Sequence, residues 1–498
     1  MCGNNRFLFV SLMVVALLAM ASTTSPSFAQ SGKPAPVEKA RSQEPKQSEV
    51  TKTDQEGPVA IAPREYGNDE RRIEQAPLGP NQLGTFGFPD INNKGEVAFL
   101  GRFISPSSYQ GVGKAIMVRS GNALRILVRD GDKAANLNEP LIDFSNPSIN
   151  ENGDLVFVGS YVDPAKKEEK RPAQPGAQPG ADEPKKSAIF IKNAAGMRMI
   201  AQIGQEVPRM PSHFGNLGSP TINSKGLITF VGTYVDPDGR GLFFLDSTQE
   251  AAKPGSGGKS NLNLIVRSGQ PSVAEGKMVY SEHFYPSAIN ERGEVAFFVR
   301  LGDSGGIFVK REKGVELVAQ QGRPGPVEGS KFIGFGNMSP SINNKGDVAF
   351  VGFFDGEKAA RALFIKEADK EGAPKMILKG GDPIGETGTT FTSFNSPAIN
   401  ERGDVAFIGF YGGRTRGIFV KTEKGIEIIA RAEDPVPGGG KGETFNNFAS
   451  VTINDRGDVV FFGQIKNGTV GIFIKDANGL RQLIKRGDLI PDTKVANK

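Results

Sequence analysis

One phrase, repeated seven times, constrains the fold of this chain more than any other feature of its sequence. It follows the pattern P-x-I-N-x-x-G-x-V-A-F and occurs as PDINNKGEVAF, PSINENGDLVF, PTINSKGLITF, PSAINERGEVAF, PSINNKGDVAF, PAINERGDVAF and VTINDRGDVVF. A fixed phrase that recurs every 53 to 73 residues is typical of a repeat architecture. Its asparagines and glycines are Asn92 and Gly95, Asn150 and Gly153, Asn223 and Gly226, Asn290 and Gly293, Asn343 and Gly346, Asn400 and Gly403, and Asn454 and Gly457.

Each unit contains four short strand-like segments separated by turn residues. The sixth unit reads FNSPAIN, ERG, DVAFIGFY, GGRTRG, IFVKT, EKG and IEIIARAEDPVPG. Segments rich in β-branched and aromatic residues, each bounded by Gly, Asn, Asp or Pro, predict four antiparallel strands, which we term A to D. No segment keeps apolar residues at a helical spacing, so we expect almost no helix.

The residues of the repeat explain the A–B turn and the burial of strand B. Asn tolerates left-handed backbone geometry and bonds its own backbone, while Gly takes positive φ without steric cost, so the motif Asn and Gly predict a tight hairpin. In the sixth unit Val405 and Phe407 point to one side of strand B, and Ala406 and Ile408 to the other. Apolar residues on both sides indicate a sheet that is covered by another sheet on each face.

Seven four-stranded units favour an all-β fold, a seven-bladed β-propeller. Propellers have typically about 4 to 8 four-stranded blades, and familiar repeats are roughly 40 to 50 residues long. A right-handed β-solenoid is the alternative, but its coils are shorter and its two open ends need caps that the sequence does not show. If strand A is innermost, each unit supplies a complete blade, so the ring can close without exchanging a terminal strand. We also consider an added outer strand at 57–63.

The repeated phrase resembles that of the NxxGxxAF tandem-repeat proteins of bacteria, exported proteins with varied surface anchors. It is similar, more distantly, to the S-P-D-G-x-x-I-A-F repeats of TolB-like propellers. The resemblance covers about residues 83 to 491, and it implies export and a propeller with strand A innermost. It supplies no catalytic residue. Unlike anchored members, this chain has no apolar C-terminal segment, which argues against wall attachment.

Composition divides the rest of the chain. Residues 1–29 have an early Arg6, an apolar run shorter than the roughly 20 residues of a membrane span, and the small-residue pattern Ser27-Phe28-Ala29, which predicts a cleaved signal peptide and no transmembrane segment afterwards. Residues 30–75, rich in Pro, Lys, Glu, Gln and Ser, predict a disordered linker. The propeller occupies 83–491 and a polar tail 492–498. Runs near 165–186 and 247–260 predict surface insertions in the second and third units.

Cysteine content and charge exclude several classes of partner and chemistry. Cys2 is the only cysteine and would leave with the signal peptide, so disulfides and Cys-ligated metals are excluded. A formal charge of +5 over 498 residues, with both signs interleaved, argues against nucleic acid as a partner.

Candidate site residues lie in the connections between strands. Enzymes built on propellers place their groups near the axis, on the face of the B–C and D–A connections, so we looked there. The two histidines of the chain, His213 and His283, precede the motif in adjacent units, and Asp382 and Asp434 close two D strands. These four are candidate ligand-face residues. The alternative is that the histidines are variable loop residues and that the repeated acids form turns, since calcium loops need the absent pattern D-x-D-x-D-G.

The acids that follow the motif glycine are interpreted in the same way, as turn and hairpin-edge residues. Three Arg-Gly-Asp tripeptides, at 402–404, 456–458 and 486–488, fall at turns and are not interpreted as adhesion signals. We assign no catalytic residue, cofactor or metal. The acids in question are Glu96, Asp154, Glu294, Asp347, Asp404 and Asp458.

We therefore expect an exported, monomeric, non-enzymatic propeller, periplasmic, extracellular or associated with the cell surface, that binds a protein or glycan partner. This expectation rests on the fold class, which does not by itself imply a function. The alternatives are a propeller hydrolase or lyase with a metal or carboxylate site at the channel mouth, and a structural envelope protein whose linker spans from the envelope to the propeller.

Overall fold

The structure, a computed structural model, describes residues 77–105, 111–163, 185–249, 261–274, 276, 278–336, 339–356, 360–413 and 415–491. The chain divides into two units, Met1–Glu70 and Arg71–Lys498, and all described residues belong to the second. The predicted signal peptide, the whole predicted linker with the possible strand at 57–63, the polar tail and most of the two insertions lie outside the described residues. Lys185 and Lys186, which we placed in the first insertion, instead begin a strand.

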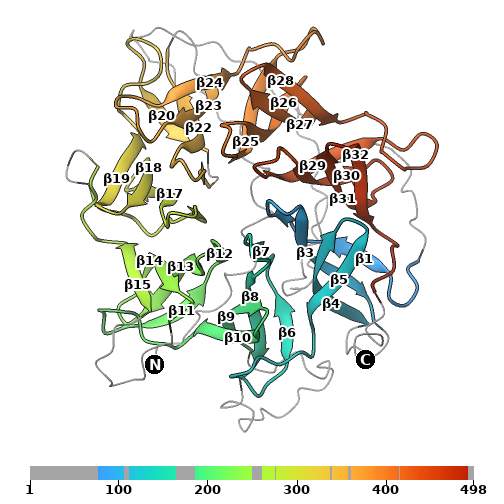
Figure 1. The fold of residues 1–498 in the computed structure, drawn as a ribbon. Coiled ribbons are helices and arrows are strands. Elements are labelled where there is room, and N and C mark those ends of the chain that lie inside the picture. The colour runs from blue at the N-terminus through green and yellow to red at the C-terminus, as the bar shows by residue number, and fades with distance from the viewer. Residues whose placement is uncertain are drawn as a thin grey trace, which may run out of the picture. The chain divides into compact units, whose positions relative to one another are not determined.

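The described residues form seven antiparallel sheets, arranged as the blades of a ring, as Figure 1 shows. The first four blades contain β1 (Leu83–Phe86), β2 (Asp90–Ile91), β3 (Glu96–Ile104), β4 (Val112–Ser120) and β5 (Ala123–Arg129); β6 (Leu141–Phe144), β7 (Ser148–Ile149), β8 (Leu155–Val162), β9 (Lys185–Asn193) and β10 (Gly196–Gln202); β11 (His213–Leu217), β12 (Thr221–Ile222), β13 (Leu227–Val235), β14 (Gly239–Asp246) and β15 (Leu262–Arg267); and β16 (Ala288–Ile289), β17 (Val295–Leu301), β18 (Ser304–Arg311) and β19 (Gly314–Gln320). The last three contain β20 (Phe332–Phe335), β21 (Ser341–Ile342), β22 (Val348–Phe354), β23 (Ala360–Lys366) and β24 (Lys375–Lys379); β25 (Phe391–Ile399), β26 (Val405–Tyr411), β27 (Thr415–Thr422) and β28 (Gly425–Arg431); and β29 (Phe445–Ile453), β30 (Val459–Ile465), β31 (Val470–Asp476) and β32 (Gly479–Lys485).

The predicted seven-bladed, all-β propeller is confirmed, since every blade is built from consecutive strands in the order A, B, C, D. In four blades strand A is split into two pieces that both pair with strand B, as β1 and β2 do with β3. No helix occurs in the described part of the chain, and hence none that is long and apolar enough to cross a membrane.

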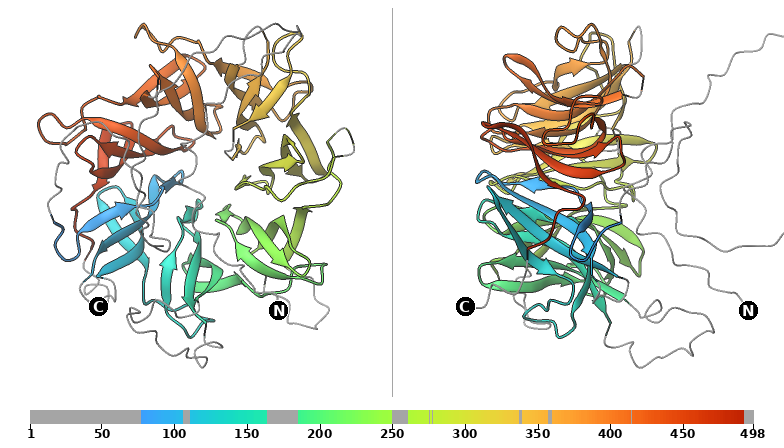
Figure 2. Two further views of the ribbon diagram at one scale, coloured as in Figure 1. Left: turned by 180° about the vertical axis from the view of Figure 1, so that it is seen from behind. Right: turned by 90° about the vertical axis from the view of Figure 1, so that its right-hand side faces the viewer.

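The strand order gives the ring two faces, visible from behind and edge-on in Figure 2. Because neighbouring strands are antiparallel, all A–B and C–D turns lie on one side, which we call the turn face. The B–C and D–A connections lie on the other side, which we call the connection face. The strands of A nearest the motif, such as β7 and β12, lie towards the ring axis, and D strands such as β15 and β19 lie at the periphery (Figure 1).

The core lies between the blades, as the apolar pattern of strand B predicts. Val405, Ala406, Phe407 and Ile408 are all at most 2% exposed. Ala406 and Ile408 pack with residues of the seventh blade, such as Phe445, while Phe407 packs with residues of the fifth. Each sheet is therefore buried on both faces, which accounts for the apolar residues on both sides of strand B.

Phenylalanines fill six of the seven blades in the same way, whereas in the first blade Met117 lies opposite Phe99. In the sixth blade the rings of Phe407 and Phe419 stack with centroids 5.7 Å apart, and Phe391 packs edge-on against Phe419. A Cβ at Gly409 would come within 2.6 Å of the Phe391 ring, so the glycine in strand B makes room for this packing. The same B–C ring pair recurs as Phe157–Phe190, Phe230–Phe243, Phe297–Phe308, Phe350–Phe364 and Phe461–Phe473.

The ring closes between the seventh and first blades without exchange of a strand. At each junction the chain just after strand D exchanges two backbone hydrogen bonds with the first residue of the next strand A, as Gly381 and Asp382 do with Phe391. At the closure Gly487 donates to the carbonyl of Leu83 (2.8 Å), and Leu83 donates to that of Asp488 (2.9 Å). The closing junction thus has the same bonds as the others but no covalent connection.

Candidate functional site

The seven motif asparagines form a closed ring of hydrogen bonds on the turn face. Each Nδ2 donates to the backbone carbonyl of the motif asparagine in the next blade, at 2.9 to 3.2 Å, and all seven side chains are buried. Asn454 completes the ring by donating to Asn92. The asparagine therefore joins blades, a role in addition to the predicted role in the turn.

The same side chain also organises its own turn. The Oδ1 atom of Asn400 accepts the backbone N–H groups of Arg402 and Asp404, and its Nδ2 donates to the Asp404 carboxylate. The equivalent bond to a carboxylate occurs in all six units that carry an acid after the glycine. The predicted role of these acids as turn and hairpin-edge residues agrees with these contacts.

The residue after each motif asparagine forms a second closed ring. Its backbone N–H donates to the side chain at the same position in the next blade; for example, the N–H of Asn93 donates to both carboxylate oxygens of Glu151. The sequence analysis did not identify this ring, because the residue type varies among Asn, Glu, Ser and Asp. Its members are Asn93, Glu151, Ser224, Glu291, Asn344, Glu401 and Asp455.

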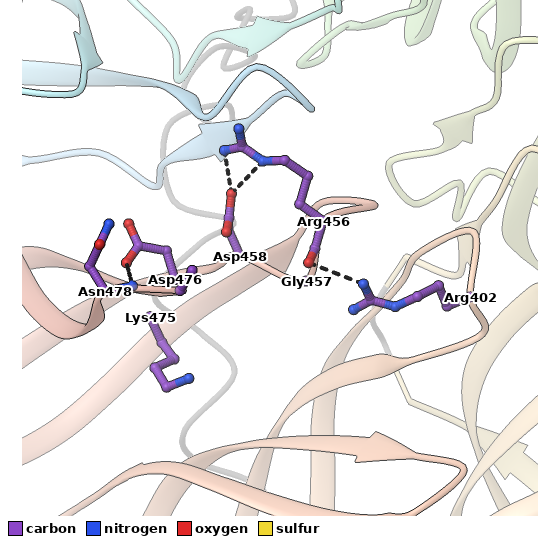
Figure 3. Close-up of a pocket in the computed structure, with 8 residues that line it drawn as sticks. Arg402, Arg456, Gly457, Asp458, Lys475, Asp476 and Asn478 are labelled. Atoms are coloured by element: carbon purple, nitrogen blue, oxygen red, sulfur yellow. Dashed lines mark hydrogen bonds and ion pairs between the residues drawn. The ribbon is translucent and has the colours of Figure 1, made fainter.

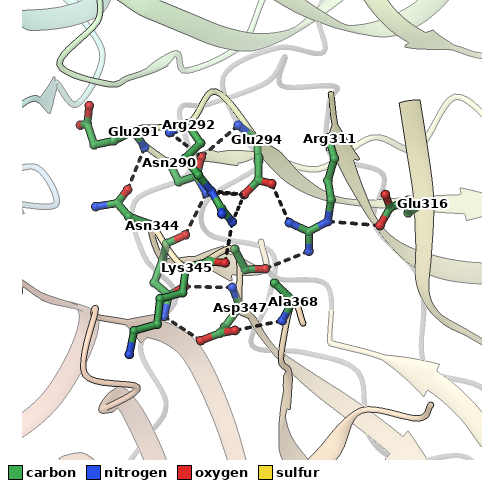
Figure 4. Close-up of polar contacts among 12 residues, drawn as sticks. Asn290, Glu291, Arg292, Glu294, Arg311, Glu316, Asn344, Lys345, Asp347 and Ala368 are labelled. Atoms are coloured by element: carbon green, nitrogen blue, oxygen red, sulfur yellow. Dashed lines mark hydrogen bonds and ion pairs between the residues drawn. The ribbon is translucent and has the colours of Figure 1, made fainter. Parts of the chain in front are cut away.

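Arginines complete the contacts between blades, as Figure 4 shows around Glu294. Asn290, Arg292 and Arg311 all donate to the Glu294 carboxylate, and Arg292 and Arg311 also reach carbonyls of the next turn. Burial alone would raise the pKa of Glu294, but these hydrogen bonds outweigh burial and hold it below its ordinary value. The polar side chains of the turn face are therefore bound to one another.

Two of the three Arg-Gly-Asp tripeptides are part of these contacts. Arg402 pairs with Asp404 at 2.7 Å, and Arg456 pairs with Asp458. In each pair the Asp side chain is at most 11% exposed. Both tripeptides therefore act as turns, in agreement with the interpretation from sequence.

A cavity of about 440 Å³ lies beside these turns, between the sixth and seventh blades (Figure 3). It is lined by Arg402, Arg456, Lys475 and Asp476, among others. Each of these four charged side chains already has a partner of opposite charge within the protein. A ligand would have to displace such a partner, so this cavity is a poor candidate for a binding site.

The four candidate residues named from sequence all lie on the connection face. Asp382 and Asp434 accept the backbone N–H of the residue three positions earlier, at 2.8 and 2.7 Å, and so cap the end of strand D. Their contacts match the alternative interpretation, that they form turns. His213 is exposed at the start of β11, where it pairs with Val235.

His283 lines a second cavity, of about 500 Å³, between the third and fourth blades. The other walls are the B–C turn after Tyr234, the end of strand D at Arg267 to Gly269, and the residues from Val279 onward. His213 is not among the lining residues, so the two candidate histidines do not line this cavity together.

Two polar side chains of this second cavity, Glu282 and His283, differ from the charged side chains that line the first. Neither Glu282 nor the imidazole of His283 has a side-chain partner among the described residues. The guanidinium of Arg267 makes one long bond, 3.4 Å, to the adjacent carbonyl of Ser268. Sequence reasoning did not single out Arg267, Val279 or Glu282, because none of them belongs to the repeated phrase.

Two carboxyl groups near the inner strands, those of Asp90 and Glu151, have a raised pKa. Burial raises the pKa of Asp90, although Ile149, Ser148 and Ile91 donate hydrogen bonds to it. Burial also raises the pKa of Glu151, and the charges of two other members of the second ring add to this effect. Within the described residues, however, no group of three or more His, Cys, Asp or Glu side chains is arranged to hold a metal ion.

Comparison with known proteins provides a family but no activity. A model of a family of unknown function, DUF7453, matches residues 70–173 and 180–495. No curated protein matches the sequence. Among solved structures, the β-propeller domain of the trilobed protease from Pyrococcus furiosus is 12% identical with a TM-score of 0.47, covering 82% of this chain and 99% of that one.

Two further structures are similar at the same low level of identity. A periplasmic gluconolactonase from Pseudomonas aeruginosa is 10% identical with a TM-score of 0.36, over 76% of this chain and 93% of that one. Prolyl oligopeptidase B from Galerina marginata is 10% identical with a TM-score of 0.45, over 85% of this chain and 53% of that one. At such identities the likeness extends to no residue of a site.

Proposed function

The chain belongs to DUF7453, a family of unknown function, and we propose that it is an exported, non-enzymatic binding module that engages a protein partner at the cell envelope through its connection face. Export is supported by the signal-peptide pattern of residues 1–29 and by the resemblance of the repeats to exported NxxGxxAF proteins. The choice of face is supported by the distribution of exposed apolar side chains.

Large apolar side chains are exposed on the connection face alone. Seven of the described residues belong to this class, and each lies in a D–A connection or at a strand end beside a B–C or D–A connection. Because all seven lie on one face, that face offers a partner more apolar surface than the turn face does. The seven are Val112, Val235, Val273, Val279, Val327, Ile333 and Leu489.

The turn face has fewer groups that are available to bind a partner. Its motif asparagines are buried, and several of its carboxylates and arginines, such as Glu151 and Arg402, bond between blades. A partner that bound there would compete with contacts that join the blades. The polar side chains that join the blades thus lie mainly on the turn face, whereas the exposed apolar side chains lie on the connection face.

The experiment compares the two faces with matched triple variants of the whole chain. One variant carries Val112→Asp, Val279→Asp and Val327→Asp on the connection face, and the other carries Lys94→Glu, Lys225→Glu and Lys345→Glu on the turn face. All six residues are exposed. Chemical cross-linking in the native cells, followed by mass spectrometry, should give an envelope protein adduct that only the first variant loses. No adduct, or an adduct lost only with the second variant, would overturn the proposal.

A further inference from the structure

The fourth blade departs from the other six at the start of strand A. In those six, two residues separate the first two apolar anchors of the strand, as Thr392 and Ser393 separate Phe391 from Phe394. In the fourth blade three residues, Ser281 to His283, separate Tyr280 from Phe284. The other five pairs of anchors are Leu83 and Phe86, Leu141 and Phe144, Phe214 and Leu217, Phe332 and Phe335, and Phe445 and Phe448.

The extra residue enlarges a bulge. In the six regular blades the register shifts so that two residues of strand A lie opposite one residue of strand B. In the fourth blade Ser281 donates to the carbonyl of Arg300, and the N–H of Arg300 donates to the carbonyl of His283. Three residues therefore lie opposite Arg300. Bulges re-aim side chains beside functional sites.

The enlarged bulge forms one wall of the 500 Å³ cavity on the connection face. Val279, 46% exposed, lies just before it, and two further exposed valines, Val235 and Val273, belong to the adjoining segments of the third blade. The side chains of Glu282 and His283 and the backbone N–H of Glu282 have no hydrogen-bond partner among the described residues.

We propose that this cavity binds an extended peptide segment of a protein partner, and this rests on the proposed function of the connection face. An apolar side chain of the segment packs against Val279. Its backbone carbonyls accept hydrogen bonds from Arg267 and the N–H of Glu282, and its backbone N–H groups donate to the Glu282 carboxylate. A cavity of this size is within the range of pockets that hold ligands of a few residues.

Peptide chemistry fits this cavity better than a glycan does. A peptide backbone offers donors and acceptors in alternation, which can pair with the Arg267 guanidinium and the Glu282 carboxylate at the rim of the cavity. An apolar contact surrounded by polar groups is also the usual arrangement of protein interfaces. The two tyrosines of the cavity, Tyr234 and Tyr280, are 3% and 2% exposed. Their rings are therefore covered and cannot serve as a platform for a sugar.

The test uses a random dodecapeptide library displayed on phage, selected on the immobilised whole chain, followed by titration of the synthetic winners by fluorescence anisotropy. We expect Val279→Asp to weaken binding at least tenfold and Arg267→Gln at least fivefold. Lys345→Asp is the control, because it also introduces a carboxylate at an exposed position, but Lys345 lies on the turn face and does not line the cavity. It should change the Kd less than twofold.

Deletion of Glu282 tests the bulge itself. It restores the two-residue spacing of the other blades, and it should abolish peptide binding while leaving Tm within about 2 °C, since the Glu282 side chain is exposed and the six other blades form their strand A with this spacing. If no peptide is selected, if the winners bind the Val279→Asp variant as tightly as the original chain, or if an envelope oligosaccharide panel binds at Val279 instead, the proposal fails. The proposed function survives that failure if the connection-face triple variant still loses its cross-linked partner.

Discussion

The side-chain amide of Asn454 donates a hydrogen bond of 3.1 Å to the backbone carbonyl of Asn92, across 362 positions of sequence. This bond joins the last blade to the first and completes the ring of asparagines. Each asparagine donates to the carbonyl of the next blade. Six of the seven accept two N–H groups of their own turn, as Asn400 does, whereas Asn343 accepts only that of Asp347. In six units the asparagine also donates to the carboxylate of its own turn. Loss of one asparagine should therefore affect two blades.

We expect Asn454→Ala to lower the free energy of unfolding by about 2 to 4 kcal/mol, because it removes one of the two hydrogen bonds to the Asn92 carbonyl, which keeps only the N–H of Gly95, and leaves the backbone N–H groups of Arg456 and Asp458 without partners. Lys94→Ala, at an exposed side chain of the adjoining turn, should change it by no more than about 0.5 kcal/mol. Urea denaturation of both variants measures the difference. Equal stabilities would show that the ring of asparagines contributes nothing to closure.

Two motif glycines provide a matched pair. Gly403 and Gly457 have φ of 82° and 88°, so alanine is strained at both, by about 1 to 2 kcal/mol. A Cβ at Gly457 would also come within 2.3 Å of the Arg402 guanidinium, whereas nothing lies within 4 Å at Gly403. We expect Gly457→Ala to be the more destabilising, and Arg402→Ala to remove the difference. A double-mutant cycle in urea checks this; an unchanged difference would exclude Arg402 as its cause.

Two C-terminal truncations test how the ring closes. Removal of 487–498 deletes the residues that bond Leu83 and Asn81, together with the buried side chain of Ile490. We expect Tm to fall by at least about 5 °C and the first blade to lose protection from amide hydrogen exchange. Removal of 492–498 alone keeps all these contacts and should leave both observables unchanged. Equal behaviour of the two truncations would contradict this account of closure.

The raised pKa of Asp90 predicts how stability depends on pH. Since burial makes the ionised carboxylate unfavourable in the folded protein, this penalty is present above the folded-state pKa and disappears as pH falls through it. Asp90→Asn removes the charge but also replaces the oxygen that accepts from Ser148 and Ile149 with an amide NH2, so the Tm of the variant relative to the original chain should be about 1 to 3 °C more favourable at pH 7 than near pH 3. Thermal melts of both proteins across this range measure it. A constant difference at all pH values would refute the assignment.

Much of the fold is predictable from sequence, and the candidate site is predictable only in part. The motif gave the number of blades and the turn residues, because the Oδ1 contacts of Asn400 reach only two and four positions along the chain. His283 was identified only as a rare residue type. A stronger signal for the cavity is that three residues rather than two separate Tyr280 from Phe284. This spacing is visible in the sequence, but it can be recognised as a bulge only once the register of strand A is known.

The sequence by itself determined a ring of seven four-stranded units, since turn geometry and two-sided burial depend on neighbouring residues. The tertiary structure alone decided which residues of different blades meet. It placed the Nδ2 of each motif asparagine on the next blade's carbonyl, and it brought Arg267 of one blade beside the bulge of the next. The physical reason is that local patterns specify bonds within a turn, whereas contacts between blades follow from the closure of the ring.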